Sequence, residues 1–229
     1  MRKTKAEVAL FCKRLLVCIV GLVLVCLAGA VNYLIELGSD PYQVFMSGLH
    51  NVLGISYGNA NLLMNGVITA MLLLFFRKYI KVALLLTTFF NGVILDGWMA
   101  LLAPVVNAQL PMAARVALML ASCLLMALGT FIYLMAQLGG SPADSVGLVI
   151  SERTHVPYRK IRWLTDGSFF LLGAVLGGQI GVNTVVLALC TGPLIGQWER
   201  LYGWARRLRQ RRREKLAALA QPARPRRAG

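Results

Sequence analysis

The amino-acid sequence predicts an all-α, polytopic membrane protein with six transmembrane helices in two inverted three-helix repeats, each containing a short helix that begins at proline. Three observations predict this fold class: an apolar composition, six long apolar segments, and an alignment between the two halves of the chain. Of the 229 residues, 58% are hydrophobic and 14% charged, and the mean hydropathy is +0.66. A soluble domain averages about 45–50% apolar and about 25% charged residues. The composition therefore excludes an ordinary soluble enzyme, a disordered protein and a small disulfide scaffold.

Six segments approach the roughly 20 apolar residues that a helix needs to cross a bilayer. The first resembles a signal peptide, with Ala28-Gly29-Ala30 as a cleavage site, but its apolar run continues past that point, so we expect a retained span. The second and fifth segments are short and would need bilayer thinning or snorkelling at their ends. The expected spans are residues 15–35, 60–76, 82–103, 112–138, 161–176 and 182–202.

The basic residues indicate the orientation of these spans. Alternate flanks carry 23 of the 24 Lys and Arg residues on one side, whereas the other side carries Arg115 alone. Because short cytoplasmic loops are enriched in Lys and Arg, this asymmetry predicts that both termini lie in the cytoplasm.

The C-terminal segment 206–229 is expected to be a basic cytoplasmic tail. Eleven of the 24 Lys and Arg residues lie from Arg200 onward. The first part is expected to continue the sixth helix, and the Pro-containing end to be disordered. We expect the bilayer and its anionic lipid headgroups, rather than nucleic acid, to be the partner of this tail, with RNA or protein binding as the alternative.

An internal repeat divides the membrane region into two halves. Residues 11–103 align without gaps onto 112–204 at an offset of 101. Each half holds three spans, and an odd number reverses the orientation of the second half, so the repeats are expected to be inverted. This divides the chain into 1–104, 105–205 and the tail. Inverted repeats are frequent in secondary transporters, and the alternative is an old duplication that now only packs helices. The matches that carry the alignment are Pro41 with Pro142, Tyr57 with Tyr158, and Gly66 with Gly167.

Each half contains a helix-start motif between its first two spans. Asp40 and Ser141 occupy the N-cap position, and prolines follow where a missing N–H costs nothing. Gln43 and Asp144, three residues after each cap, would complete capping boxes. We expect short helices over 41–53 and 142–151. One alternative is that each short helix lies at the membrane interface. The other is that each is re-entrant, with its positive N-terminus aimed at a substrate or ion. The motif residues are Asp40, Pro41, Gln43, Ser141 and Pro142, with Asp144.

The two-half arrangement and the segment Leu138-Gly139-Gly140-Ser141-Pro142-Ala143-Asp144 resemble the YczE/YitT-type bacterial integral membrane proteins. The resemblance covers about residues 10–204 and implies a multi-pass protein of the bacterial cytoplasmic (inner) membrane, for which permease-like transport is suggested. It implies no catalytic residues. The first-half motif departs from the pattern, with Asp40 in place of the serine and Gln43 in place of the aspartate.

Polar side chains inside the spans are candidates for a substrate or ion pathway, because a charge at a helix centre costs about 2.5–3.5 kcal/mol on insertion scales. Asn61 and Asn65 are four residues apart and share one helix face. Asp166 aligns with Asn65, and its alternative role is an ion pair with Arg162. Asp96 could instead be an interfacial group that reaches headgroup water. The candidates are Asp144, Asp166, Asn65, Asn61 and Asp96.

The remaining chemistry of the sequence favours transport over catalysis. The five cysteines lie in apolar runs without a CxxC pair, and the two histidines are isolated, so we expect no disulfide framework, no metal and no cofactor. No hydrolase, zinc-protease or nucleotide-binding motif occurs, and we expect no enzymatic activity. The expected function is transport of an unknown small solute. The alternative is a non-transporting membrane scaffold or regulatory protein that assists another membrane or biosynthetic protein.

Overall fold

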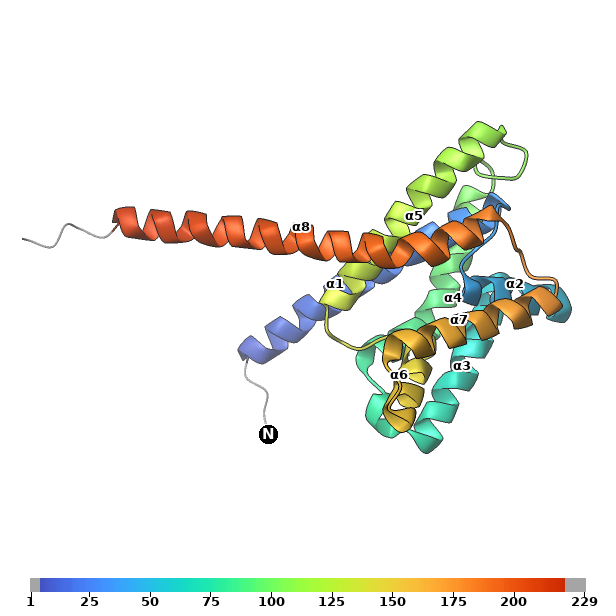
Figure 1. The fold of residues 1–229 in the computed structure, drawn as a ribbon, viewed down its shortest axis with the longest axis horizontal. Coiled ribbons are helices and arrows are strands. Elements are labelled where there is room, and N and C mark those ends of the chain that lie inside the picture. The colour runs from blue at the N-terminus through green and yellow to red at the C-terminus, as the bar shows by residue number, and fades with distance from the viewer. Residues whose placement is uncertain (1–4, 221–229) are drawn as a thin grey trace, which may run out of the picture.

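The computed structural model describes residues 5–220, without the side chains of residues 159, 209 and 211–220. All regular structure in these residues is helical, which confirms the all-α class (Figure 1). The Pro-containing end of the predicted tail lies outside the described residues. The elements are α1 (Lys5–Leu34), α2 (Pro41–Leu53), α3 (Tyr57–Phe75), the 3₁₀-helix η1 (Arg77–Tyr79), α4 (Val82–Leu102), α5 (Met112–Met135), α6 (Pro142–Thr154), α7 (Tyr158–Val175) and α8 (Val182–Ala220).

Four of the described helices, α1, α3, α4 and α5, are long and apolar enough to cross a membrane. They coincide with the first four predicted spans. The fifth and sixth predicted spans are also helical, as α7 and α8, but they are more polar. The segment Arg159-Lys160-Ile161-Arg162 opens α7, and α8 runs into the basic tail with Pro193 inside it. The chain is therefore a helical membrane protein with four candidate spans among its described residues.

The helix boundaries recur at the same offset of 101 residues that relates the two halves of the sequence. The short helices α2 and α6 are each 13 residues long, and both begin at a proline. The recurring bounds are the ends of α1 and α5 at Leu34 and Met135, the starts of α2 and α6 at Pro41 and Pro142, their ends at Leu53 and Thr154, and the starts of α3 and α7 at Tyr57 and Tyr158.

Left-handed backbone conformations recur at the same offset. These conformations follow the ends of α1, α2, α5 and α6, where a residue with positive φ ends a helix. The matched pairs are Glu36 and Gln137 (φ 52° and 54°), Gly38 and Gly139 (104° and 115°), and Gly54 and His155 (62° and 55°).

The two helix-start motifs differ in their capping. Ser141 and Asp144 form the predicted reciprocal capping box at α6. At α2, Asp40 accepts hydrogen bonds from the backbone N–H groups of Tyr42 and Gln43, but the Gln43 side chain does not return one to the cap. The capping box predicted at α2 is therefore incomplete, because only the Asp40 side chain forms its hydrogen bonds.

Helices α1 and α5 cross at glycines. A Cβ atom on Gly21 would lie 2.5 Å from the backbone nitrogen of Tyr133, and one on Gly129 would lie 2.9 Å from that of Val25. Around this crossing α4 packs on α1 and α8 packs on α5, while α2 packs on α7 and α3 on α6. The start of α1 and the far end of α8 lie toward the same side of the view (Figure 1).

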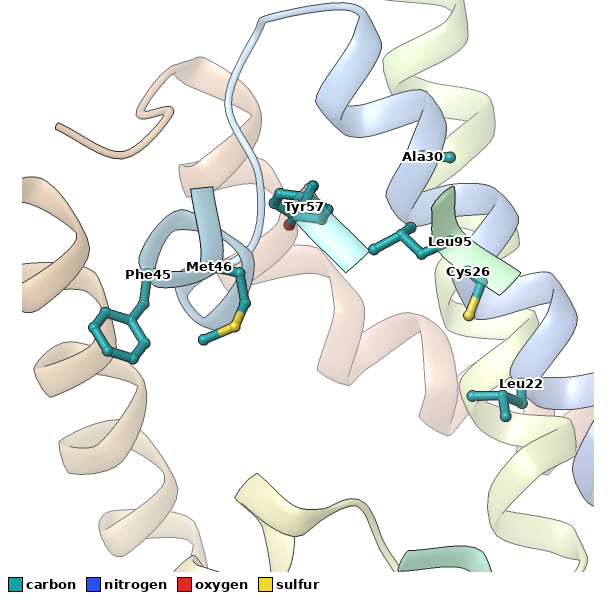
Figure 2. Close-up of a cluster of buried hydrophobic side chains, with 7 residues drawn as sticks. All are labelled: Leu22, Cys26, Ala30, Phe45, Met46, Tyr57 and Leu95. Carbon is teal, nitrogen blue, oxygen red and sulfur yellow. The ribbon is translucent and has the colours of Figure 1, made fainter. Parts of the chain in front are cut away.

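A core cluster of side chains joins α1 to the short helix α2 and to α3 and α4. Figure 2 shows Leu22, Cys26 and Ala30 in a row along α1, with Leu95 of α4 beside them. Phe45 and Met46 of α2 point in different directions. This core holds α2 against the long helices. Its members are Leu22, Cys26, Ala30, Phe45, Met46, Tyr57 and Leu95.

One helix pair breaks the correspondence between the halves. In the first half α3 packs closely on α4, and a Cβ atom on Gly92 would lie 2.2 Å from the carbonyl oxygen of Gly58. In the second half α7 and α8 are not among the closely packed pairs of the described residues. Leu189 of α8 is 70% exposed, whereas Thr88, which takes its place in α4, is 2% exposed. The seam between α3 and α4 is closed, and its counterpart between α7 and α8 is open.

Candidate functional site

Four of the five polar candidates gather into two clusters, near the places where α2 packs on α3 and on α7. We call the first the amide cluster and the second the ionic cluster. The amide cluster comprises Cys26, Tyr42, Asn61, Asn65 and Asn91, and the ionic cluster comprises Asp144, Tyr158, Arg162 and Asp166.

The amide cluster is a continuous chain of neutral hydrogen bonds. The Asn61 Oδ1 atom accepts from Asn65 Nδ2 at 2.6 Å and from Asn91 Nδ2 at 2.9 Å. The Tyr42 hydroxyl donates to Asn65 Oδ1 at 2.6 Å, and the Cys26 thiol donates to Asn91 Oδ1 at 2.8 Å. Asn61 and Asn65 are buried, so these amides satisfy one another where water is scarce.

The ionic cluster is centred on Arg162. Its Nε atom donates to Asp166 Oδ2 at 3.1 Å, which is the ion pair one turn apart that the sequence left as an alternative for Asp166. Its Nη1 atom also donates to Asp144 of α6 and to the Tyr158 hydroxyl, which in turn donates to Asp144. The Arg162 side chain is 49% exposed, so the cluster is partly open to its surroundings. The structure thus brings Asp144 and Asp166 together through one guanidinium group.

Tyr42 and the N-cap residue Asp40 bring the start of α2 close to α7. The ring of Phe169 on α7 lies edge-on to Tyr42, with 5.1 Å between ring centroids. Burial raises the pKa of Asp40 to about 6; Asp166 adds to this rise, while Arg162 and two backbone N–H donors oppose it. The charges of Asp166 and Arg162 in the ionic cluster therefore affect the pKa of Asp40.

The clusters occupy matching positions in the two halves. At the offset of 101, Asn61 corresponds to Arg162 and Asn65 to Asp166. The side chains of each pair contact one another, as a hydrogen bond in the first half and as an ion pair in the second. The same pair of helix positions is neutral in one half and ionic in the other.

Asp96 lies apart from both clusters. Its Oδ1 atom accepts from the Gly58 backbone N–H at 2.7 Å, and its Oδ2 atom accepts from the Ser56 hydroxyl at 2.6 Å. The carboxylate thus binds the N-terminus of α3, where the positive end of the helix dipole favours a negative charge. Asp96 holds α3 against α4.

Gln43 is the unexpected residue of the helix-start motif. Its side chain is 8% exposed, and its Oε1 atom has no hydrogen-bond partner among the described residues. Pro41 and Pro142 open the two short helices, and Ser141 remains bound within its capping box. Gln43 therefore offers an unused acceptor at the start of α2.

The arrangement suits hydrogen bonding and charge exchange. Neutral amides can bind a polar solute, and carboxylates beside an arginine can exchange a proton or a cation. Among residues 5–220, no group of three His, Cys, Asp or Glu side chains could hold a metal ion. The site predicted from the sequence did not include Tyr42, Cys26 and Tyr158. It also lacked Arg162, although the alignment of Asn61 with Arg162 between the two halves could have identified this residue.

Comparisons with known proteins agree with the membrane assignment. A model described as "Family of unknown function (DUF6198)" matches residues 12–200. An uncharacterized protein of Haemophilus influenzae is 28% identical over 69% of this chain and 71% of its own. The uncharacterized membrane protein YczE of Bacillus subtilis is 28% identical over 75% of this chain and 80% of its own, and YyaS of the same organism is 23% identical over 77% and 87%. No solved structure matches the chain. The YczE-type resemblance is confirmed.

Proposed function

Since the chain belongs to the DUF6198 family of membrane proteins, we propose that it carries a small polar solute across the bacterial cytoplasmic membrane by alternating access. In this proposal the two halves are inverted repeats of three spans each, with the amide and ionic clusters between them. Secondary transporters frequently have this architecture, with their sites at the repeat interface.

One observation carries the proposal: two halves with matching helix boundaries have one matching seam closed and the other open. Helix bounds and left-handed residues recur at an offset of 101, yet α3 packs on α4 while α7 stands away from α8. A carrier with inverted repeats changes sides when its halves exchange conformations. An open α7–α8 seam beside a closed α3–α4 seam is the asymmetry that such a carrier requires.

The clusters would then divide the work. The amide cluster would exchange its internal hydrogen bonds for hydrogen bonds to the solute, and Asp144 and Asp166 would couple the passage of the solute to a proton or cation. Asp96 stabilises the closed seam between α3 and α4, because its carboxylate on α4 accepts hydrogen bonds from the N-terminus of α3.

The proposed topology has six spans and both termini in the cytoplasm. The strong bias of Lys and Arg to alternate flanks supports it. The start of α1 and the far end of α8 also lie on the same side of the molecule (Figure 1). Reporter fusions at residues 1 and 229 test the topology, and opposite locations of the two tags would contradict it.

Matched cysteine pairs test the exchange without knowledge of the solute. The hydroxyl oxygens of Thr69 and Thr88 lie 2.7 Å apart across the closed seam, so Thr69→Cys with Thr88→Cys should form a disulfide readily. The same positions in the second half are Phe170 and Leu189. In a variant without native cysteines, Phe170→Cys with Leu189→Cys should also cross-link in membranes, more slowly, as the second seam closes transiently.

Two further variants make the cross-linking decisive. A control pair, Leu171→Cys with Leu189→Cys, is rotated about one-quarter turn around α7 and should cross-link less. Locking the first seam through residues 69 and 88 should abolish the cross-link of the second. Equal yields from positions 170 and 171, or an unchanged yield after locking, would refute the exchange.

Reconstituted vesicles test transport itself. Uptake from a panel of radiolabelled amino acids, sugars and nucleosides should require a proton or sodium gradient. Asp144→Asn and Asp166→Asn should each weaken the uptake while the protein keeps its elution volume in size-exclusion chromatography. Normal uptake by both variants would remove the ionic cluster from the pathway.

A second candidate function is supported by the surface of α7. Leu164, Leu171 and Val175 are 64%, 64% and 85% exposed, and a partner protein could cover them in a scaffold or regulatory complex. This candidate predicts a stoichiometric partner that co-purifies and protects residue 171 from thiol labelling, together with no cross-link between positions 170 and 189.

A further inference from the structure

An apolar groove runs between the C-terminal part of α3 and helix α6. Its volume is about 340 Å³, which lies at the lower end of the roughly 300–1,000 Å³ of small-molecule sites. Leu72 and Val149 form its buried floor. Arg153 and Thr154 lie where α6 ends, at the mouth of the groove. The apolar walls are Met71, Leu72, Phe76, Val146, Val149 and Ile150.

The groove exists because two glycines of the contact between α2 and α7 are replaced by bulky residues in the equivalent contact between α6 and α3. The contact between α2 and α7 is tight: a Cβ atom on Gly173 would lie 2.6 Å from the backbone nitrogen of Phe45, and one on Gly48 would lie 2.8 Å from Leu176. The positions of Gly48 and Gly173 are taken by Val149 and Leu72 at the offset of 101. These side chains hold α6 away from α3, and a trough remains.

The mouth of the groove is positively charged. The guanidinium carbon of Arg153 lies 5.1 Å from the centroid of the Phe76 ring, at the edge of the apolar wall. The neighbouring Lys78 and Glu152 neutralise each other through a salt bridge. Arg153 forms no salt bridge with a carboxylate of the described residues, and Arg77 next to Phe76 also lies at this end of α3. In the first half the position of Arg153 is taken by Val52.

The flank of the groove faces the acyl region. Leu74 and Phe75 on α3 are 72% and 71% exposed, as expected for side chains in contact with lipid. Arg77, Lys78 and Arg153 belong to the basic flanks of the chain, where the anionic leaflet lies. A lipid can thus enter the groove sideways from the bilayer while its headgroup stays at the level of Arg153.

We propose that this groove binds one anionic phospholipid, with its phosphate on Arg153 and an acyl chain along the floor formed by Leu72 and Val149. A zwitterionic lipid such as phosphatidylcholine would fill the trough but would bring its own cationic ammonium group close to Arg153 and Arg77, which weakens its binding relative to a lipid with a net negative charge. A soluble phosphate would pair with the guanidinium but leave the trough empty. The combination of apolar floor and available cation selects an anionic amphiphile, and basic pockets between membrane helices are known to bind such headgroups. The inference does not depend on transport.

Native mass spectrometry of the full-length protein from bilayer nanodiscs tests the site. The nanodiscs contain equal amounts of phosphatidylglycerol and phosphatidylcholine with the same acyl chains. The wild type should retain one phosphatidylglycerol with a preference of about fivefold, the effect of one basic residue at an anionic surface. Arg153→Gln should reduce this preference to about even, whereas Arg14→Gln, at an exposed arginine of α1 outside the groove and outside the basic tail, should keep it.

Two more arms separate the sources of binding. Val149→Phe fills the groove while leaving Arg153 in place, and it should lose the retained lipid altogether. Inorganic phosphate added in excess should not displace phosphatidylglycerol, whereas displacement would mean that the site recognises a free anion. Equal retention of both lipids by the wild type, or an undiminished preference in Arg153→Gln, would overturn the proposal.

Discussion

Replacing Gly92 by alanine is expected to force open the seam between α3 and α4. The added methyl carbon would lie 2.2 Å from the carbonyl oxygen of Gly58, so the helices must separate by about 1 Å to restore an ordinary van der Waals contact. Both atoms in conflict are backbone-anchored, and neither side can yield by rotating a side chain.

The cost can be worked from the contacts of the seam. Overpacking of a tight contact costs about 1–3 kcal/mol. Separation also weakens the hydrogen bond from Gly58 to Asp96 at 2.7 Å and the one between Thr69 and Thr88 at 2.7 Å, which contribute about 1 kcal/mol each. We expect a loss of about 2–4 kcal/mol, or about 5–15 °C in Tm at about 2–4 °C per kcal/mol.

The thermal unfolding of each variant can be followed by the reactivity of the buried thiols. Cys18, Cys26 and Cys123 are buried and become reactive to a thiol-specific fluorophore on unfolding, while Cys12 and Cys190 are exposed and give a constant background. Gly97→Ala is the matched control on the same helix, because nothing lies within 4 Å of its added Cβ. A helix-interior glycine costs about 0.5–1 kcal/mol relative to alanine, so this control should melt slightly higher than the wild type. If Gly92→Ala melts at or above Gly97→Ala, the close seam does not exist.

Three further changes test the site. Asp40→Asn keeps the helix cap but removes a carboxyl whose pKa burial raises from 3.8 to about 6. The wild type should lose stability as pH rises through this window, because its folded state prefers the proton, and circular dichroism melting should show a shallower loss in the variant than in the wild type. Gln43→Met removes a buried acceptor without a partner and should raise the stability by about 1 kcal/mol in thermal unfolding; a lower Tm would show that the amide is satisfied. Arg162→Gln leaves two carboxylates facing each other and should lower the free energy of unfolding by about 1 kcal/mol. Adding Asp166→Asn should partly restore this stability, whereas additive effects of the two substitutions would contradict the ion-pair geometry.

Local signals predicted most of the helix boundaries. Asp40 followed by proline placed the start of α2, and the expected range 41–53 agrees with the structure. The expected range 142–151 was three residues short, because the left-handed residue that ends α6 is His155 rather than a glycine. A histidine in this conformation carries no recognisable stop signal.

Contacts between distant residues could not be predicted in the same way. Arg162 pairs with Asp166 one turn away, as spacing allows, but its second partner Asp144 is 18 residues distant and depends on how α6 folds back on α7. Asp96 looked like a membrane-embedded charge, yet it caps a helix 38 residues earlier in the chain. Gln43 looked like half of a capping box, but the packing of α2 against α1 turned its amide inward. Each depends on helix packing, which periodicity and composition do not encode.

The proline within α8 makes the α7–α8 seam different from the matching α3–α4 seam. Pro193 occupies in α8 the place that Gly92 occupies in α4, and its ring prevents the intimate backbone approach that glycine permits. The α7–α8 seam would therefore close less tightly than the α3–α4 seam. If the protein works by the proposed alternating access, the conformation with the α3–α4 seam closed and the α7–α8 seam open would have the lower free energy, and the transport cycle would start from it.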